Sequence, residues 1–307
     1  MPQRTPSTGN HQAFVVKKGR SVASPGNALV KLFRRALAEG TTREGWLAVE
    51  GPLLLEEVIK ASLQRPGPQR SSSGRSERAG ETRAFERPRV QSVLASNSAM
   101  RKYATLLDRL PPEAELTEVP DRVFAGIAQT ETPQGIAALV ELPRHDLDAI
   151  LARRDTLIVI ACGVQDPGNL GTIMRSVEAL GGSALLTLHA TVSPYNPKAV
   201  RSSAGAIFRL PVFRGLDAND LTPRLRAARV TIAAADRHRG QSLAEADLRG
   251  PVAFLIGQEA AGLPAALARQ ADVQLSIPLR AEVDSLNAAT AAAILLYEAA
   301  RQRGFGF

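Results

Sequence analysis

Two polar side chains between Gly163 and Ser176 could take part in chemistry. Asn169 is a plausible N-cap for a helix whose apolar residues recur at helical spacing. Arg175 lies off that apolar stripe and shares a helix face with Gly171, where the missing side chain leaves room for a ligand or another backbone. A guanidinium stays protonated and can stabilise a developing negative charge. An ordinary cap and a solvated arginine would explain the same residues.

Two further loops carry polar groups beside apolar segments. In the first, Gly257 lets the backbone approach a ligand and Glu259 could accept hydrogen bonds, although an ordinary strand-to-helix turn explains this loop equally well. In the second, Ser285, Leu286 and Asn287 precede an alanine-rich helix that ends near Arg301, and Ser285 is expected to cap it. Hydroxyl, amide and exposed backbone N–H groups therefore occur together at a helix start.

The three loops lie between elements typical of an α/β domain. Five segments are mostly apolar on both faces, as expected of strands that are covered on both sides, and helical segments separate them. These expected strands are Thr156–Cys162, Ala184–Leu188, Val230–Ala234, Val252–Ile256 and Val273–Ile277. We predict a largely parallel sheet with helices on both sides, in which ligands bind at the carboxyl ends of the strands.

The N-terminal half predicts a second, smaller α/β unit. Composition divides the chain into a disordered basic arm at 1–26, this unit at 27–142, a polar linker at 143–154 and the parallel domain at 155–307. Within the smaller unit, Ser98–Leu107 is expected to form one helix. Residues 65–89 are low in complexity and are expected to form an unstructured insertion.

Positive charge is concentrated near the N-terminus. The 38 basic and 30 acidic residues give a net charge of +8, and residues 1–36 contain seven basic residues and no acidic one. This distribution favours a polyanionic partner such as RNA, although a tail kept basic for solubility is an alternative. The candidate RNA-binding residues are Lys17, Lys18, Arg20, Arg34, Arg35 and Arg201.

Several classes of protein are disfavoured. No apolar run approaches the roughly 18 residues of a membrane helix, and the first twenty residues lack the apolar stretch of a secretory signal, so we expect a cytoplasmic protein with no membrane partner. The single cysteine, Cys162, excludes an intramolecular disulfide and a structural zinc cluster and is expected in the core. The four histidines show no metal-ligand spacing, so no metal is expected.

Taken together, the three loops resemble the motifs of the SpoU/TrmH family in the SPOUT superfamily, whose members are S-adenosylmethionine-dependent RNA ribose 2′-O-methyltransferases. The first motif is similar to residues 166–175, the second to 256–259 with Gly262, and the third to 277–279 with 285–287. Gln258 stands where asparagine is commoner, which keeps the side-chain amide. The resemblance covers residues 155–303 well. It is weaker over 28–140, which looks like a small ribosomal-protein-like substrate-binding domain.

The resemblance implies a C-terminal trefoil-knotted SPOUT domain, S-adenosyl-L-methionine bent into the knotted loops, and a homodimer whose interface builds the active site. It places Gly257, Ile277 and Leu286 against the cofactor, largely through backbone groups. Leu279, Ser285 and Asn287 would lie beside them. The catalytic residues would be Arg175, Asn169 and Glu259. The resemblance admits Arg175 as a general base. Because guanidinium groups in proteins stay protonated, we favour electrostatic stabilisation as its role.

Three functions compete at this point. We favour methylation of a ribose 2′-hydroxyl in structured RNA, with ribosomal RNA preferred slightly over transfer RNA. A non-catalytic RNA-binding or ribosome-assembly protein with the same fold is the second hypothesis. A nicotinamide-dependent enzyme is the third, but the glycines do not form the G-x-G-x-x-G fingerprint.

Overall fold

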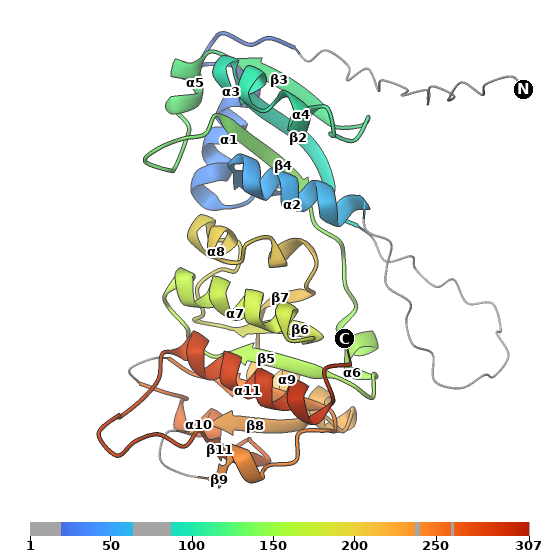
Figure 1. Cartoon of the computed structure of the whole chain (residues 1–307), viewed down its shortest axis with the longest axis vertical. Helices are drawn as coiled ribbons and strands as arrows, with labels where there is room; N and C mark the ends of the chain where they lie inside the picture. The colour runs from blue at the N-terminus through green and yellow to red at the C-terminus, as the bar shows by residue number, and fades with distance from the viewer. Residues whose placement is uncertain (1–19, 64–86, 237–239, 259–260, 307) are drawn as a thin grey trace, which may run out of the picture.

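The computed structural model describes residues 20–63, 87–236, 240–258 and 261–306. These form two α/β units, each built around its own sheet, with the N-terminal unit at the top of Figure 1. Several of the sequence-based expectations lie outside the described residues: the bulk of the basic arm with Lys17 and Lys18, most of the 65–89 insertion, and Glu259.

The N-terminal unit is a mixed four-stranded sheet with helices on both faces. Its strand order is β1-β4-β2-β3, and only β2 and β3 run parallel. Helix α2 packs on one face, and α1 and α5 pack on the other. The elements are β1 Leu47–Glu50, β2 Arg89–Ser96, β3 Glu115–Val119, β4 Ile136–Glu141, α1 Ala28–Glu39, α2 Pro52–Leu63, α3 Asn97–Lys102, α4 Ala104–Leu107 and α5 Asp121–Ala125.

Two details of this unit differ from the sequence-based expectations. The single helix expected at Ser98–Leu107 is two short helices, because Tyr103 leaves helical geometry at φ −116° and separates α3 from α4. The chain is also structured ahead of residue 27, since the Val22 N–H donates to the Glu118 carbonyl at 2.9 Å and the Glu118 N–H donates to the Arg20 carbonyl at 3.0 Å. Residues 20–22 therefore extend the edge of the small sheet and do not belong to the arm.

The C-terminal unit is a parallel seven-stranded sheet, which confirms the prediction of an α/β protein with a mostly parallel sheet. Its order is β7-β6-β5-β10-β8-β11-β9, and every neighbouring pair is parallel. The strands are β5 Leu157–Ala161, β6 Ala184–Leu188, β7 Val212–Leu216, β8 Thr231–Ala235, β9 Gln241–Ser242, β10 Val252–Ile256 and β11 Val273–Ser276. The two edge strands, β7 and β9, were not predicted.

Helices cover both faces of this sheet. Side chains alternate along β5, so that Leu157 and Val159 face one core while Ile158 and Ile160 face the other. The first core contains α7 (Pro167–Ala179), α8 (Pro197–Ser202) and α11 (Ala288–Gln302), and the second contains α6 (Leu147–Leu151), α9 (Ala218–Ala227) and α10 (Ala265–Ala268). No helix within the described ranges is long and apolar enough to cross a membrane.

The segment expected to be a polar linker contains helix α6. Leu147, Ile150 and Leu151 are buried against the second core, because their spacing of three and four places them on one helix face. The Asp146 side chain caps this helix by accepting from the Asp148 N–H at 2.9 Å. The connection between the units is thus docked on the C-terminal sheet.

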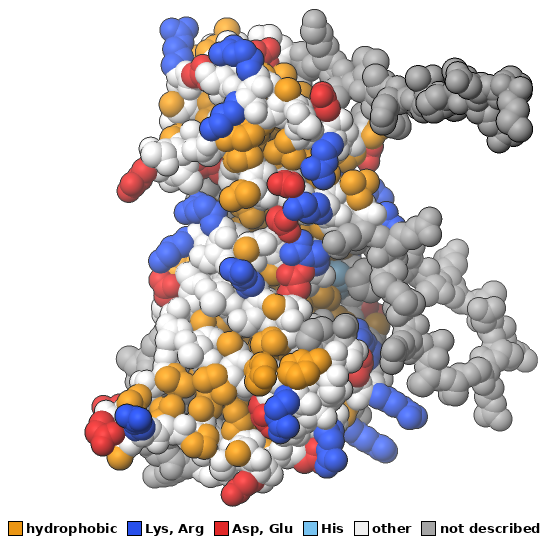
Figure 2. Space-filling model, viewed as in Figure 1, with side chains coloured by type: hydrophobic (Ala, Val, Ile, Leu, Met, Phe, Trp, Pro, Cys, Tyr) orange, Lys and Arg blue, Asp and Glu red, His pale blue; other side chains and the backbone are white. Residues whose placement is uncertain are grey.

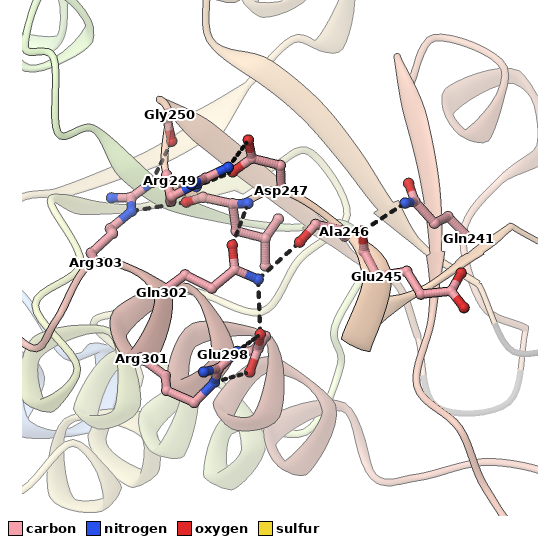
Figure 3. A network of polar contacts seen from close by, with 11 residues as sticks. Gln241, Glu245, Ala246, Asp247, Arg249, Gly250, Glu298, Arg301, Gln302 and Arg303 are labelled. Carbon is pink, nitrogen blue, oxygen red and sulfur yellow. Dashed lines mark hydrogen bonds and ion pairs between the residues drawn. The ribbon is translucent and has the colours of Figure 1, made fainter.

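The C-terminal end of α11 is anchored by the polar contacts in Figure 3. The Gln302 side chain donates to the Ala246 carbonyl and accepts from the Leu248 N–H, both at 2.8 Å. The Arg303 guanidinium donates to the carbonyls of Leu248 at 3.0 Å and Asp155 at 2.8 Å. Because these contacts fix the end of α11, they also fix the direction in which its opposite end points.

Cys162 lies in the core, as predicted from the sequence, and is only 3% exposed. Burial raises the pKa of its thiol to about 12, so the thiol stays protonated and unreactive well above neutral pH. We expect a thiol reagent at pH 8 to label the native protein no faster than the protein unfolds, and to label it rapidly in denaturant. Since this is the only cysteine, the colour change of such a reagent reports it directly. Fast, stoichiometric labelling of the native protein would contradict the burial.

Candidate active site at the carboxyl edge of the parallel sheet

Helix α7 follows β5, and its N-cap lies three residues earlier than expected. Pro167 is the first helical residue, a position that proline favours, and Asp166 is the N-cap. The Asp166 side chain accepts from the Asn169 N–H at 2.8 Å. The prediction that Asn169 caps this helix is therefore wrong, and its side chain is left to act elsewhere.

Lys198 in α8 binds the N-cap of α7. Its ammonium lies 2.9 Å from the Asp166 carboxylate, and this contact together with the Asn169 N–H holds the pKa of Asp166 below its ordinary value. Both side chains are about half exposed. Lys198 was not predicted as a site residue, because only the fold brings it beside a residue 32 positions earlier.

The third loop meets the first through a pair of amides. Asn287, and not Ser285 as predicted, caps α11: its side-chain oxygen accepts from the N–H groups of Ala289 at 2.9 Å and Thr290 at 3.3 Å. Asparagine and serine are equally good caps, so composition alone does not choose between them. With its oxygen used in this way, the Asn287 amide nitrogen donates to the Asn169 side-chain oxygen at 3.0 Å.

The second loop meets the first through Gln258. After β10, the chain makes a tight turn in which Gln258 and Gly262 exchange backbone hydrogen bonds of 3.1 and 2.9 Å. The Gln258 side chain lies over Gly163, where a Cβ atom would come within 2.8 Å of its amide nitrogen. Gly163 also has a φ of +76°, which favours glycine. In the sequence, Gln258 stands out only as a departure from the family pattern.

Gly257 sits where no side chain fits. A Cβ atom there would lie 2.3 Å from the Gly262 carbonyl carbon and 2.5 Å from the Leu263 nitrogen. The sequence suggested that a ligand could come close to the backbone at this glycine. In the structure, the close neighbours of Gly257 are backbone atoms of Gly262 and Leu263 in the loop that follows β10. Gly257 and Gln258 are half-buried residues at the end of β10.

The segment from Ile277 to Asn287 offers backbone groups to a ligand. It is described throughout, and the backbone hydrogen bond within residues 277–286 joins the Val283 N–H to the Arg280 carbonyl at 3.0 Å. Ile277, Ser285 and Leu286 are half-buried and Leu279 is exposed. Most N–H and C=O groups of this segment are thus open to solvent or to a bound molecule.

Arg175 does not point toward Asn169. At about 100° per residue, a separation of six residues places the two side chains about 120° apart around α7. Arg175 instead follows Gly171, and a Cβ atom on Gly171 would lie 2.4 Å from the Ala199 carbonyl oxygen, so α8 fills that space rather than a ligand. The Arg175 side chain is exposed and has no hydrogen bond or ion pair with another described residue.

The candidate RNA-binding residues in the described part of the chain lie on the surface. They are Arg20, Arg34, Arg35 and Arg201, and Arg35 pairs with Glu39 at 2.7 Å on the same helix. Among the described residues, no group of three or more His, Cys, Asp or Glu side chains could hold a metal ion.

The fold is that of an α/β protein with two sheets, and the three loops meet where the strand order of the parallel sheet changes direction, between β5 and β10. A profile of the SpoU rRNA Methylase family matches residues 156–297. The chain is 36% identical over 209 residues to a 23S rRNA (uridine(2479)-2'-O)-methyltransferase of Streptomyces viridochromogenes, covering 66% of this chain and 73% of that protein. It is 37% identical over 174 residues to the 23S rRNA (guanosine(2553)-2'-O)-methyltransferase RlmP of Bacillus subtilis, covering 57% and 68%.

Likeness to solved structures extends over both units. The SpoU methyltransferase AviRb from Streptomyces viridochromogenes, crystallised in complex with AdoMet, superposes with a TM-score of 0.73 at 29% identity and covers 92% of this chain and 100% of that one. The chain belongs to the SpoU rRNA methylase family, which confirms the resemblance predicted from its three motifs.

Proposed function

We propose that this protein is an enzyme that transfers a methyl group from S-adenosylmethionine to a ribose 2′-hydroxyl of ribosomal RNA. The observation that carries the proposal is the meeting of three turns at the carboxyl edge of the parallel sheet, joined by the 3.0 Å hydrogen bond between Asn287 and Asn169 and the contact of Gln258 with Gly163. Named relatives that methylate 23S rRNA support the reaction and its substrate class.

The residues at this edge fit S-adenosylmethionine. The open backbone groups of 277–286 match an adenine and a ribose, which present both donors and acceptors. Gly257, Ile277 and Leu286 would hold the cofactor through the backbone, with Leu279, Ser285 and Asn287 around it. When bound, S-adenosylmethionine supplies an electrophilic methyl group on a sulfonium.

Arg175 would act on the acceptor. A ribose hydroxyl is a very weak acid, so alignment and stabilisation of the developing alkoxide must provide most of the rate. A guanidinium can do this while binding the adjacent phosphate, whereas a role as general base would require it to lose a proton that it holds tightly. Asn169 would orient the ribose or Arg175, and Glu259 would fix Arg175 or a neighbouring backbone group.

A homodimer would bring these groups together, because Arg175 and Asn169 leave α7 on different sides. Hydrophobic side chains gather over α11 and the loop leading into it, as Figure 2 shows, and they include Tyr297 and Val283, which are 53% and 44% exposed. An exposed apolar face of this kind is typical of a subunit interface. The trefoil knot that the family resemblance implies belongs to the same part of the chain.

The shared site has a direct test. Co-expression of Arg175→Ala with Gly257→Ala subunits should return activity, since a mixed dimer holds one intact site if the arginine comes from the partner subunit. Mixed dimers that form but stay inactive would place the whole site in one subunit. A monomer in sedimentation equilibrium at micromolar concentration would end the dimer proposal.

The small unit and the basic N-terminal residues would bind the RNA. Deleting residues 1–19, which carry Arg4, Lys17 and Lys18, should weaken RNA binding and reduce the slope of log affinity against log salt by up to about 3, because each of these side chains can neutralise one phosphate. Filter binding across a salt series measures this slope. An unchanged slope would mean that these residues only aid solubility.

The substrate is tested by incubating the protein with tritiated S-adenosylmethionine and separate pools of ribosomal and transfer RNA, followed by mapping of the labelled ribose. We expect label in ribosomal RNA, in a protein that works in the cytoplasm. Label in transfer RNA alone would move the substrate to that class. A protein that binds RNA but shows no heat of cofactor binding would be a non-catalytic assembly factor.

A further inference from the structure

The two units are in close contact around α8 and the 3-10 helix Ala206–Phe208. Gly40 ends α1, and a Cβ atom on it would lie 2.0 Å from the Tyr195 carbonyl oxygen. On the other side, a Cβ atom on Gly205 would lie 2.7 Å from the Cβ of Glu57 in α2. Apolar residues of α2, α7 and α8 share one buried cluster. The small unit therefore packs directly against the elements that surround α7.

Arg209 links the two units at this contact. Its guanidinium binds the Glu178 carboxylate in α7 with two nitrogens, one of them at 3.1 Å, and its third nitrogen lies 2.9 Å from the Glu57 carboxylate in α2. All three side chains are only about a quarter exposed, at 24%, 27% and 29%. A planar fork of five donors can serve both carboxylates at once, which a lysine cannot do.

The charges of this cluster are balanced by its neighbours. Burial alone would raise the pKa of Glu57, but hydrogen bonds from Lys60 and Arg209 hold that pKa below its ordinary value. Hydrogen bonds and charge interactions with Glu178, and then with Glu57, raise the pKa of the Arg209 guanidinium. Glu57 and Arg209 are therefore ionised at neutral pH. Partly buried ion pairs of this kind are screened less by salt than exposed ones.

Glu178 lies three residues, or about one helical turn, after Arg175 in α7. We infer that Arg209 is a positioning residue for methyl transfer: through Glu57 and Glu178 it fixes the small, RNA-binding unit relative to the helix that carries Arg175, so that bound RNA presents its ribose there. The inference rests on the proposed function for the RNA, but the link between the two units stands on the contacts alone. Among the described residues, Arg209 forms no hydrogen bond or ion pair with a candidate catalytic or cofactor residue.

The activity test separates the link from the fold. Glu57→Gln removes the negative charge that pairs with Arg209 across the units and leaves Arg209 paired with Glu178 inside the C-terminal unit, whereas Arg209→Met removes both contacts. We expect both variants to lower kcat/KM for RNA by about ten-fold, which corresponds to a coupling of about 1.4 kcal/mol, with unchanged affinity for S-adenosylmethionine. Glu56→Gln, at the preceding residue of α2, is the matched control. Wild-type kcat/KM for RNA in both variants would overturn the inference, as would a parallel loss of cofactor affinity.

A second measurement does not depend on catalysis. Spin labels at Glu44→Cys and Asp220→Cys, both exposed and one in each unit, can report the distance between the units because the native Cys162 is buried. Arg209→Met and Glu57→Gln should broaden the distance distribution relative to the doubly labelled parent. A distribution that stays equally narrow in both variants would overturn the inference even if the protein methylates RNA. A broadened distribution in a protein that methylates no RNA would uphold the link while refuting the proposed function.

Discussion

Replacement of Arg175 by alanine is expected to reduce methyl transfer to RNA by about a thousand-fold or more while leaving the affinity for S-adenosylmethionine nearly unchanged. Removal of one group that stabilises a developing oxyanion typically costs a factor of 10² to 10³, and removal of its bond to the adjacent phosphate would add to it. The fold should survive, because the side chain is exposed and forms no hydrogen bond or ion pair with another described residue. Single-turnover methylation and cofactor calorimetry measure the two quantities.

Two further variants sharpen this prediction. Arg175→Lys keeps the charge and loses the fork, so it should fall between alanine and wild type. Arg226→Ala, an exposed arginine in α9 on the opposite face of the sheet, is the control and should retain full activity. A full-rate Arg175→Ala protein would remove this residue from the mechanism.

The Gly257→Ala variant is expected to lose at least about a hundred-fold in affinity for S-adenosylmethionine, with methyl transfer lost in parallel. The new Cβ atom would lie 2.3 to 2.5 Å from backbone atoms of Gly262 and Leu263, so the turn after β10 must move away from the position it holds beside Gly163. Backbone recognition tolerates little displacement, since a shift of about 1 Å can cost a hundred-fold in function. Isothermal titration of the cofactor measures the loss.

Gly250→Ala is the matched control for this variant. A Cβ atom at Gly250 meets no other atom within 4 Å, and the residue lies at the opposite end of β10. We expect its cofactor affinity and thermal midpoint to match those of the wild type. If Gly257→Ala also bound the cofactor with native affinity, the turn after β10 would not be part of the binding site.

The buried strands could be predicted from the sequence, and the exposed ones could not. Strands β5, β6, β8 and β10 are largely apolar because helices cover both of their faces, and that pattern predicts a parallel sheet. Strand β11 is only partly buried, and Val273 and Leu275 alternate there with polar residues. The edge strand β7 carries the exposed Arg214 and Gly215, and β9 has only two residues, so neither has a distinctive pattern. Helix α6 is five residues long, which is too short for its periodicity to stand out from a polar linker.

The candidate site was predicted through its family motifs, while its contacts depend on the fold. Local preference allowed Asn169 and Ser285 as caps, but Pro167 and the alanine run after Asn287 shift both helix starts. The hydrogen bond between Asn169 and Asn287 joins residues 118 positions apart, and no local pattern predicts such a pair. The same holds for Arg209 and Glu57, which are separated by 152 positions.

The most direct measurement is a crystal structure of the protein with S-adenosylhomocysteine. We predict that the ligand lies against the backbone of Gly257, Ile277 and Leu286 within one subunit, with an Arg175 guanidinium, from the same or the partner subunit, facing its sulfur. A ligand bound elsewhere, or the three turns separated in every subunit, would contradict the account.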